Sequence, residues 1–204
     1  MTSITSILFL YIIVVLSSII HEYAHGWAAL RQGDSTAKYA GRLTLNPLPH
    51  LDLWGTVLMP LFILFITQGQ GFFGYAKPVP INPYNFKNQR SGMIWVSVAG
   101  VGANFLIAVI LGLAVRFSSS SLTMSLLGEI AFINIWLGLF NLLPFPPLDG
   151  SKLLLAAIGY RGSGRFASFM ALASSPFGII VAVLIAMTFL PYVSYFLFKL
   201  IVGG

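Results

Sequence analysis

The sequence predicts an all-α, polytopic membrane protein of about 4–6 transmembrane helices, with a short strand or re-entrant element around residues 40–75. The first observation behind this prediction is composition: 57% of the 204 residues are hydrophobic and 8% are charged. The mean hydropathy is +0.89, whereas a soluble domain carries about 25% charged residues. The second observation is that hydrophobic stretches recur from end to end, so we expect one integral-membrane domain over residues 1–204.

The charged residues also limit the classes of function. The net charge of +6 arises from Lys and Arg in short segments between the hydrophobic runs, which is typical of the positive-inside bias. No basic helix or patch with interleaved aromatic residues is present, so we expect no nucleic-acid partner. With no Cys, and only three His and five acidic residues, any bound metal needs His, Asp or Glu ligands.

The first predicted span runs from about residue 4 to residue 30, roughly 40 Å of helix. We interpret residues 5–20 as part of this retained span and not as a signal peptide, because no basic segment precedes them and no small-residue cleavage site follows. Further hydrophobic regions are expected at 92–117, at 122–143 and at 173–202, the last with a kink at Pro191.

Residues 38–52 differ in pattern. Arg42-Leu43-Thr44-Leu45 alternates like a strand, and Pro47 and Pro49 then exclude a regular helix. Residues 53–67 are apolar but short, so we expect them to enter the membrane and return without crossing it. With the N-terminus outside, this topology places most of the eleven Lys and Arg residues on the cytoplasmic side.

The most informative motif is His21-Glu22-Tyr23-Ala24-His25. On a helix, residues i and i+4 lie on one face about 6 Å apart along the axis, so both imidazoles can bind one cation. Glu22 then flanks the metal and can take a proton from water. Inside a membrane each such group costs roughly 2.5–3.5 kcal/mol, which favours a metal over the alternatives of a proton relay or a satisfied polar pair.

A catalytic zinc needs a third protein ligand. Asp149 follows the span at 122–143, and two crossings between it and His25 return it to the same side of the membrane. It therefore has the best expected geometry, and Asp34 is expected to cap or turn the loop after the first span. The full set of candidates is His50, Asp34, Asp52, Glu129 and Asp149.

The pairing of HEYAH with NLLPFPPLDG, more than a hundred residues later, resembles the site-2 protease family of intramembrane zinc metalloproteases. The segments GRLTLNPLPHLD, GYAKPVPINP and VAGVGANF are similar to compact bacterial members without PDZ or CBS domains. The likeness covers about residues 15–160. The motif reads LDGSK where many relatives have a second Gly, and because Ser151 is small we expect no loss of function.

The resemblance implies one Zn²⁺ per chain bound by His21, His25 and Asp149, with Glu22 as general base. It implies that Asn141 binds the substrate carbonyl or its oxyanion, the alternative being a helix-packing hydrogen bond. His50 is a candidate for supporting the site or binding substrate, although a lone His is more often structural.

We therefore predict an intramembrane zinc metalloendopeptidase that cleaves membrane-protein substrates within or beside their transmembrane segments. We expect it to be an integral protein of the cell membrane, embedded in the lipid bilayer, with its active site towards the cytoplasmic side. The Gly71–Gly74 turn and the strand at 42–45 are expected to offer an edge for an extended substrate. A metal-dependent transporter would favour internal repeats, and none is evident. Loss of Glu22 or of a metal ligand would favour an inactive scaffold, and all of these residues are present.

Overall fold

The computed structural model describes residues 4–68, 74, 76–158 and 164–204. The chain divides into two compact units, Met1–Phe86 and Lys87–Gly204. Helices dominate both units, and no β-strand occurs among the described residues. The all-α, polytopic membrane class is confirmed.

Three described helices are long and apolar enough to cross a membrane, and a bent pair makes a fourth candidate if it acts as one span. The pair bends by 77°. The described helices therefore give four spans, the lower end of the predicted range of 4–6, only if this pair counts as one span. The three helices are Thr5–Gln32, Gln89–Arg116 and Ser121–Asn141, and the pair is Phe166–Ala173 with Pro176–Thr188.

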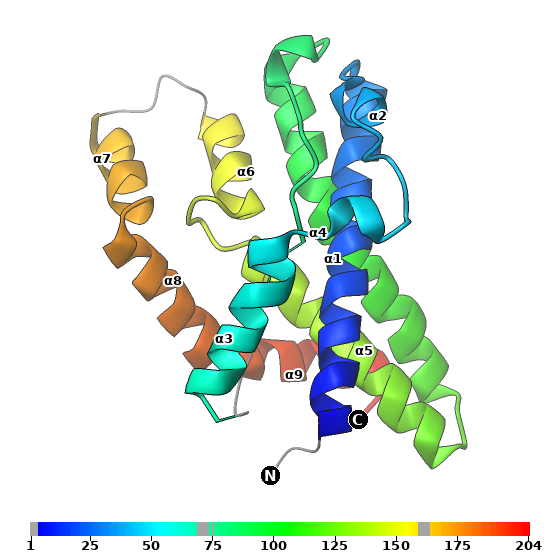
Figure 1. The fold of residues 1–204 in the computed structure, drawn as a ribbon. Coiled ribbons are helices and arrows are strands. Elements are labelled where there is room, and N and C mark those ends of the chain that lie inside the picture. The colour runs from blue at the N-terminus through cyan, green and yellow to red at the C-terminus, as the bar shows by residue number, and fades with distance from the viewer. Residues whose placement is uncertain (1–3, 69–73, 75, 159–163) are drawn as a thin grey trace. The chain divides into compact units, whose positions relative to one another are not determined.

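The first unit contains one long helix, α1, followed by short elements (Figure 1). After α1 come α2, the 3₁₀ turn η1, the π-helical η2, α3 and the 3₁₀ turn η3. Their bounds are Ile4–Gln32, Thr36–Tyr39, Leu48–His50, Leu53–Leu58, Met59–Ile66 and Pro83–Asn85.

Asp52 begins the apolar helical segment formed by η2 and α3. Its carboxylate accepts from the backbone N–H groups of Trp54 at 3.0 Å and Gly55 at 2.7 Å, while the Thr56 hydroxyl accepts from the Asp52 N–H at 3.0 Å. This reciprocal pattern satisfies the open donors of a helix start. Asp52, one candidate for the third metal ligand, is therefore a helix cap.

Hydrogen bonds join the residues that precede this apolar helical segment to residues that follow it. The Lys77 N–H donates to the His50 carbonyl at 2.9 Å, and the Arg42 guanidinium donates to the Lys77 carbonyl at 2.6 Å. The helix Leu53–Ile66 is about 20 Å long, less than the ~30 Å hydrocarbon core. Residues 50 and 77, on either side of this helix in the sequence, are therefore hydrogen-bonded to each other, and the re-entrant path stays a prediction.

The strand expected at Arg42–Leu45 is wrong. Local and side-chain hydrogen bonds take the place of a strand ladder: the Thr44 hydroxyl accepts from the Asn46 N–H at 3.1 Å, and the Thr44 carbonyl lies 2.9 Å from the His50 ring. This stretch thus offers no strand edge to a substrate. Of the expected Gly71–Gly74 turn, residues 71–73 lie outside the described residues.

In the second unit, α4 (Gln89–Arg116) and α5 (Ser121–Asn141) pack along each other. Ser120 caps α5 by accepting from the Thr123 N–H at 3.4 Å, so the turn between α4 and α5 ends in a helix cap. Between the two helices the fully buried Asn104 amide donates to the buried Asn134 side-chain oxygen at 2.9 Å. Such polar contacts hold transmembrane helices together where the hydrophobic effect cannot.

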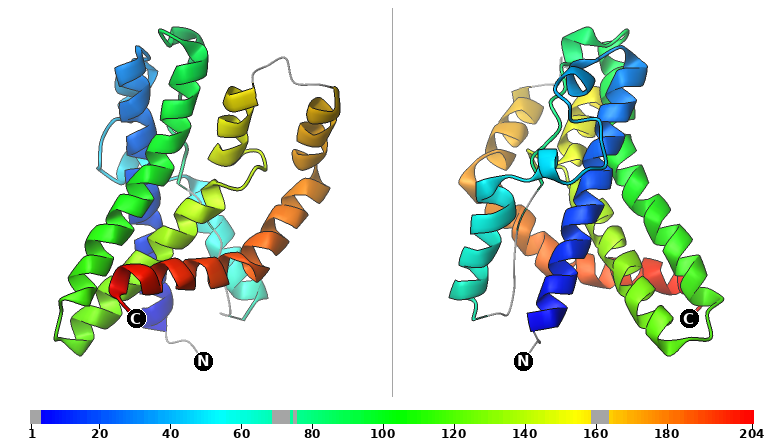
Figure 2. Two further views of the ribbon diagram at one scale, coloured as in Figure 1. Left: turned by 180° about the vertical axis from the view of Figure 1, so that it is seen from behind. Right: turned by 45° about the vertical axis from the view of Figure 1, so that its right-hand side comes forward.

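The C-terminal region is divided into four helices, α6 (Asp149–Ile158), α7 (Gly164–Ala173), α8 (Pro176–Thr188) and α9 (Leu190–Val202). In Figure 2, left, α9 runs across α4 and α5, which it contacts. Pro191 lies in the first turn of α9, where its missing N–H costs nothing. The expected kink is therefore a break between two helices.

Replacing Asn104 with Leu should destabilise the α4–α5 pair, because the Asn134 oxygen loses its buried donor. The expected loss is about 0.6–1.7 kcal/mol, or a few degrees in unfolding temperature. Thermal unfolding in detergent measures it, with Leu106→Ala at an exposed position of α4 as control. Equal unfolding temperatures for Asn104→Leu and the parent would contradict the assigned role of this contact.

Candidate metal centre

His21 and His25 converge within one turn of α1. Both side chains are buried, their Nε2 atoms lie 2.9 Å apart, and the ring planes are perpendicular. Two nitrogens bound to one tetrahedral zinc lie about 3.3 Å apart, given Zn–N distances of about 2.0–2.1 Å. The ring nitrogens thus converge as a shared zinc ion requires.

Glu22 completes a cluster with the two histidines. One ligand atom from each of His21, Glu22 and His25 lies within 4.8 Å of the others, the one such group of three or more found among the described residues. The Glu22 side chain is half-buried, and its Oε2 accepts from the Val79 N–H at 2.7 Å. A zinc ion fits this donor set, with the carboxylate beside the histidines and anchored by a backbone donor.

Gly26 lies one turn after Glu22 and allows the segment containing Val79 to approach α1. A Cβ at this position would lie 3.1 Å from the Val79 Cγ1 and 3.3 Å from the Leu43 Cδ1. Any larger side chain would push these neighbours outward. The sequence reasoning did not identify Gly26 or Val79, although the glycine directly after HEYAH was a visible signal.

Asp34 ties the loop after α1 to the segment before α4. One carboxylate oxygen accepts from the Asn82 N–H at 2.7 Å, and the other from the Asn85 amide at 2.8 Å and the Thr36 N–H at 3.1 Å. Burial raises the pKa of Asp34, but the hydrogen bond from the Thr36 hydroxyl, together with those from Asn82, Asn85 and the Thr36 N–H, outweighs it, so that the pKa lies below its ordinary value of 3.8. The expectation that Asp34 turns the loop is confirmed.

His50 lies in the same unit and is fully buried. Its Nε2 is 2.9 Å from the Thr44 carbonyl, and because a carbonyl only accepts, Nε2 carries the proton. Its backbone carbonyl receives the Lys77 N–H, and its Nδ1 has no hydrogen-bond partner within the described parts of the chain. These contacts brace the loop; a role in catalysis or substrate binding stays a prediction.

In the second unit, Asp149 is the first residue of α6 and is buried. The Lys152 ammonium donates to its Oδ1 at 2.9 Å. At Gly150 a Cβ would lie 2.1 Å from the Leu142 carbonyl oxygen, so α6 begins directly against the end of α5. The Ser151 hydroxyl donates to the Leu148 carbonyl at 2.6 Å, which shows how Ser occupies the place of the second Gly.

Arg90 fixes the other end of α6. Its guanidinium donates to the carbonyls of Ala156 at 2.9 Å and Ala157 at 2.6 Å. A cation at a helix C-terminus is stabilised by the unpaired carbonyls and by the helix dipole. The sequence reasoning did not find this contact, because Arg90 and Ala156 are far apart along the chain.

Asn141 is the last residue of α5 and is half-buried. Its amide donates to the Leu137 carbonyl at 3.0 Å, a hydrogen bond within its own helix. The amide nitrogen has a second hydrogen, so this contact is compatible with both predicted roles, and substrate binding by Asn141 stays a prediction. Glu129, another ligand candidate, is half-buried in the same helix.

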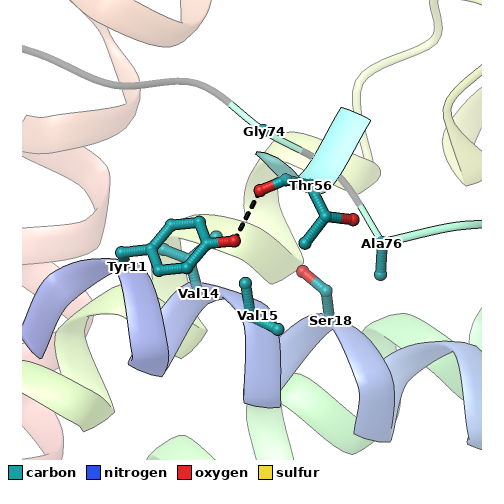
Figure 3. A pocket seen from close by; sticks show the side chains of 7 residues that line it. All are labelled: Tyr11, Val14, Val15, Ser18, Thr56, Gly74 and Ala76. Atoms are coloured by element: carbon teal, nitrogen blue, oxygen red, sulfur yellow. Dashed lines mark hydrogen bonds between the residues drawn. The ribbon is translucent and has the colours of Figure 1, made fainter. Parts of the chain in front are cut away.

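A small pocket lies beside α1, one turn before the metal cluster (Figure 3). Tyr11, Val14, Val15 and Ser18 of α1 line it on one side, and Thr56, Gly74 and Ala76 line it on the other. The Tyr11 hydroxyl donates to the Thr56 carbonyl. The pocket has room for about one water molecule. It is too small to hold a substrate side chain of any size.

Comparison with known proteins gives a consistent picture. The model of peptidase family M50 matches residues 118–185, which include Asn141 and Asp149. YwhC of Bacillus subtilis, described as "Putative zinc metalloprotease", is 38% identical over 188 residues, which cover 83% of this chain and 82% of YwhC. No solved structure matches the chain.

Two further relatives are longer than this chain. Rip2 of Mycolicibacterium smegmatis, with the same description as YwhC, is 33% identical over 139 residues, covering 67% of this chain and 52% of Rip2. The zinc metalloprotease MJ0392 of Methanocaldococcus jannaschii is 23% identical over 164 residues, 78% of this chain and 38% of the relative. The similarity thus covers most of this chain in each case.

Replacing His25 with Ala should reduce bound zinc from about one ion per chain to a small fraction of that, because a four-coordinate site loses a protein ligand. Metal analysis of the purified protein measures this. Asp149→Ala should have the same effect if Asp149 is the third ligand, while Glu129→Gln serves as the matched control. Full zinc content in His25→Ala would exclude the proposed centre.

The Asp34 carboxylate should make the fold sensitive to acid. Its folded pKa is lower than its unfolded pKa of about 3.9, so its stabilisation is complete above that value and is lost as the pH falls through the folded pKa. Asp34→Asn should lower the unfolding temperature at pH 7 by a few degrees. The difference from the parent should stay constant down to about pH 4 and shrink as the pH falls further, through the folded pKa; a difference that does not shrink there would show that the charge of Asp34 plays no part.

Proposed function

This chain belongs to peptidase family M50, the site-2 protease family of zinc metalloproteases, and from this premise we propose that it hydrolyses peptide bonds within or beside transmembrane segments of other proteins. The observation that carries the proposal is the position of the His21, Glu22 and His25 cluster. It lies in the C-terminal half of α1, a helix long and apolar enough to span the bilayer. Chemistry at this position is chemistry inside the membrane.

The residues have distinct roles in the proposed reaction. His21, His25 and Asp149 hold the zinc, which when bound polarises the scissile carbonyl and makes water a stronger acid. Glu22 takes the proton from the attacking water and passes it to the leaving amine. The Asn141 amide donates to the carbonyl oxygen as negative charge develops there.

The substrate is a membrane protein whose cleaved segment must be unwound. In a helix the backbone N–H and C=O groups hydrogen-bond to one another, and the bilayer contains no water that could replace these hydrogen bonds. A transmembrane helix therefore presents no accessible peptide bond until it opens locally.

Residues 1–204 act as one catalytic domain in this proposal.

The site faces the cytoplasmic side of the cell membrane. The metal cluster lies towards the C-terminal end of α1, and the basic residues Arg31, Lys38 and Arg42 follow directly. Basic residues concentrate in cytoplasmic loops. The end of α1 that carries the site is thus the cytoplasmic end.

Purified protein in detergent should cleave a model single-span substrate, and Glu22→Gln should lower kcat by about 10²–10⁴-fold, because the general base is lost while the ligands remain. Mass spectrometry of the products and metal analysis of both proteins measure this. Glu129→Gln, which removes a carboxylate from α5, is the control and should cleave like the parent.

Two results would overturn the proposal. If the parent and Glu22→Gln both hold zinc and neither cleaves any tested span, the chain acts as a metal-binding scaffold. If Glu22→Gln cleaves as fast as the parent, the base is another group.

A further inference from the structure

We propose that the Val79 N–H is the positioning group for the Glu22 carboxylate, and that the segment carrying it is held in place by Arg42 on one side and Asp34 on the other. This inference rests on the proposed function, since it assigns a task to the base of that reaction. All the residues involved belong to the first unit. We name residues 77–82 the strap.

The contact between the strap and Glu22 is direct. The Val79 N–H donates to Oε2 at 2.7 Å, within the range of a charge-assisted hydrogen bond. A carboxylate on a helix can rotate about its side-chain bonds, and a proton acceptor must lie within hydrogen-bond reach of the proton that it takes. A donor fixed on one oxygen leaves the other oxygen in a defined direction, so the base does not have to be ordered at each turnover.

The sequence of the strap makes this donor unusual. Val79 lies between Pro78 and Pro80, neither of which has an N–H. Pro80 also restricts Val79 to extended conformations. The direction of the Val79 N–H is therefore set by the local sequence, and it is the one backbone donor among these three residues.

One end of the strap is fixed by the loop before the re-entrant segment. The buried Arg42 guanidinium donates to the Lys77 carbonyl at 2.6 Å and the Pro78 carbonyl at 3.4 Å. The Lys77 N–H in turn donates to the His50 carbonyl at 2.9 Å. Both backbone groups of Lys77 are thus bonded two residues before the donor.

The other end is fixed by the buried Asp34, whose carboxylate accepts from the Asn82 N–H at 2.7 Å. Between the two ends, the buried Val79 side chain packs over Gly26, where a Cβ would lie only 3.1 Å away. The strap is therefore anchored on both sides of Val79 and in contact with α1 at its centre. Packing of this kind is what a positioning group needs, because an error of about 1 Å can cost 10²-fold in rate.

The most direct test replaces the Val79 amide with an ester, by incorporating the hydroxy-acid analogue of valine at this position. The side chain stays and only the N–H is lost. We expect kcat on the model substrate to fall about 10–100-fold, the range for losing a hydrogen bond to a charged group. KM should change less than about twofold, because substrate binding is not affected, and zinc content should equal that of the parent. Val79→Ala, which keeps the N–H, is the matched control and should retain most of the activity.

A second measurement does not depend on activity. Pro-Val occurs once in the chain, at Pro78-Val79, so labelling Pro carbonyls with ¹³C and Val nitrogens with ¹⁵N gives one amide resonance. In Glu22→Gln this proton should move upfield, because the acceptor loses its charge. It should not move in Glu129→Gln.

The outcomes separate this proposal from the proposed function. If the parent cleaves and the ester protein cleaves equally fast, or if the Val79 resonance is the same in Glu22→Gln, the positioning role is excluded. Loss of zinc in the ester protein would show that the strap supports the metal site as a whole, which also overturns the role assigned here. If the parent itself never cleaves, the proposed function fails and this inference with it.

Gly26→Ala provides an independent route should the ester protein not accumulate. Its methyl group must push Val79 outward. We expect a shifted Val79 resonance and a lower kcat with zinc retained. Parent-like activity together with a shifted resonance would contradict the proposal.

Discussion

The bilayer provides no water, so each polar group that enters it must find its partner within the protein. The first unit shows how this constraint is met. Two histidines and a glutamate form one cluster on α1, and the glutamate receives a backbone donor from the returning chain. Hydrogen bonds among His50, Lys77 and Arg42 join the chain on either side of the apolar helix Leu53–Ile66. The proposed chemistry uses these contacts, because Val79 follows Lys77 directly after Pro78 and donates to Glu22.

Features that repeat along the chain could be predicted from sequence. Hydrophobic length predicted spans at about 4–30, 92–117 and 122–143, and the structure has helices at 4–32, 89–116 and 121–141. The i, i+4 spacing predicted the convergence of His21 and His25. Both depend only on the geometry of a helix. The break before Asp149 could also be predicted, because a run of prolines cannot continue a helix.

Contacts between distant segments could not be predicted in this way. Arg42 alternates with apolar neighbours as a strand residue would, yet its guanidinium binds carbonyls 35 and 36 positions later. Arg90 looks like one more basic loop residue, and its partners lie near the end of α6. Neither hydrophobic periodicity nor secondary-structure propensity carries information about contacts between residues far apart in sequence. For this reason the strand predicted at 42–45 is wrong, and the contact of Arg90 with the end of α6 was not predicted.

The prolines on either side of Val79 have a consequence for how the strap meets other chains. An extended backbone normally invites a second strand through its alternating donors and acceptors. Here two donors are absent, and the remaining one is bound to Glu22. A peptide lying along residues 78–80 would therefore meet carbonyls alone. Residues 78–80, beside the proposed base, therefore lack the row of free donors through which an exposed edge pairs with another strand, a protection that edge strands elsewhere gain from charges or bulges.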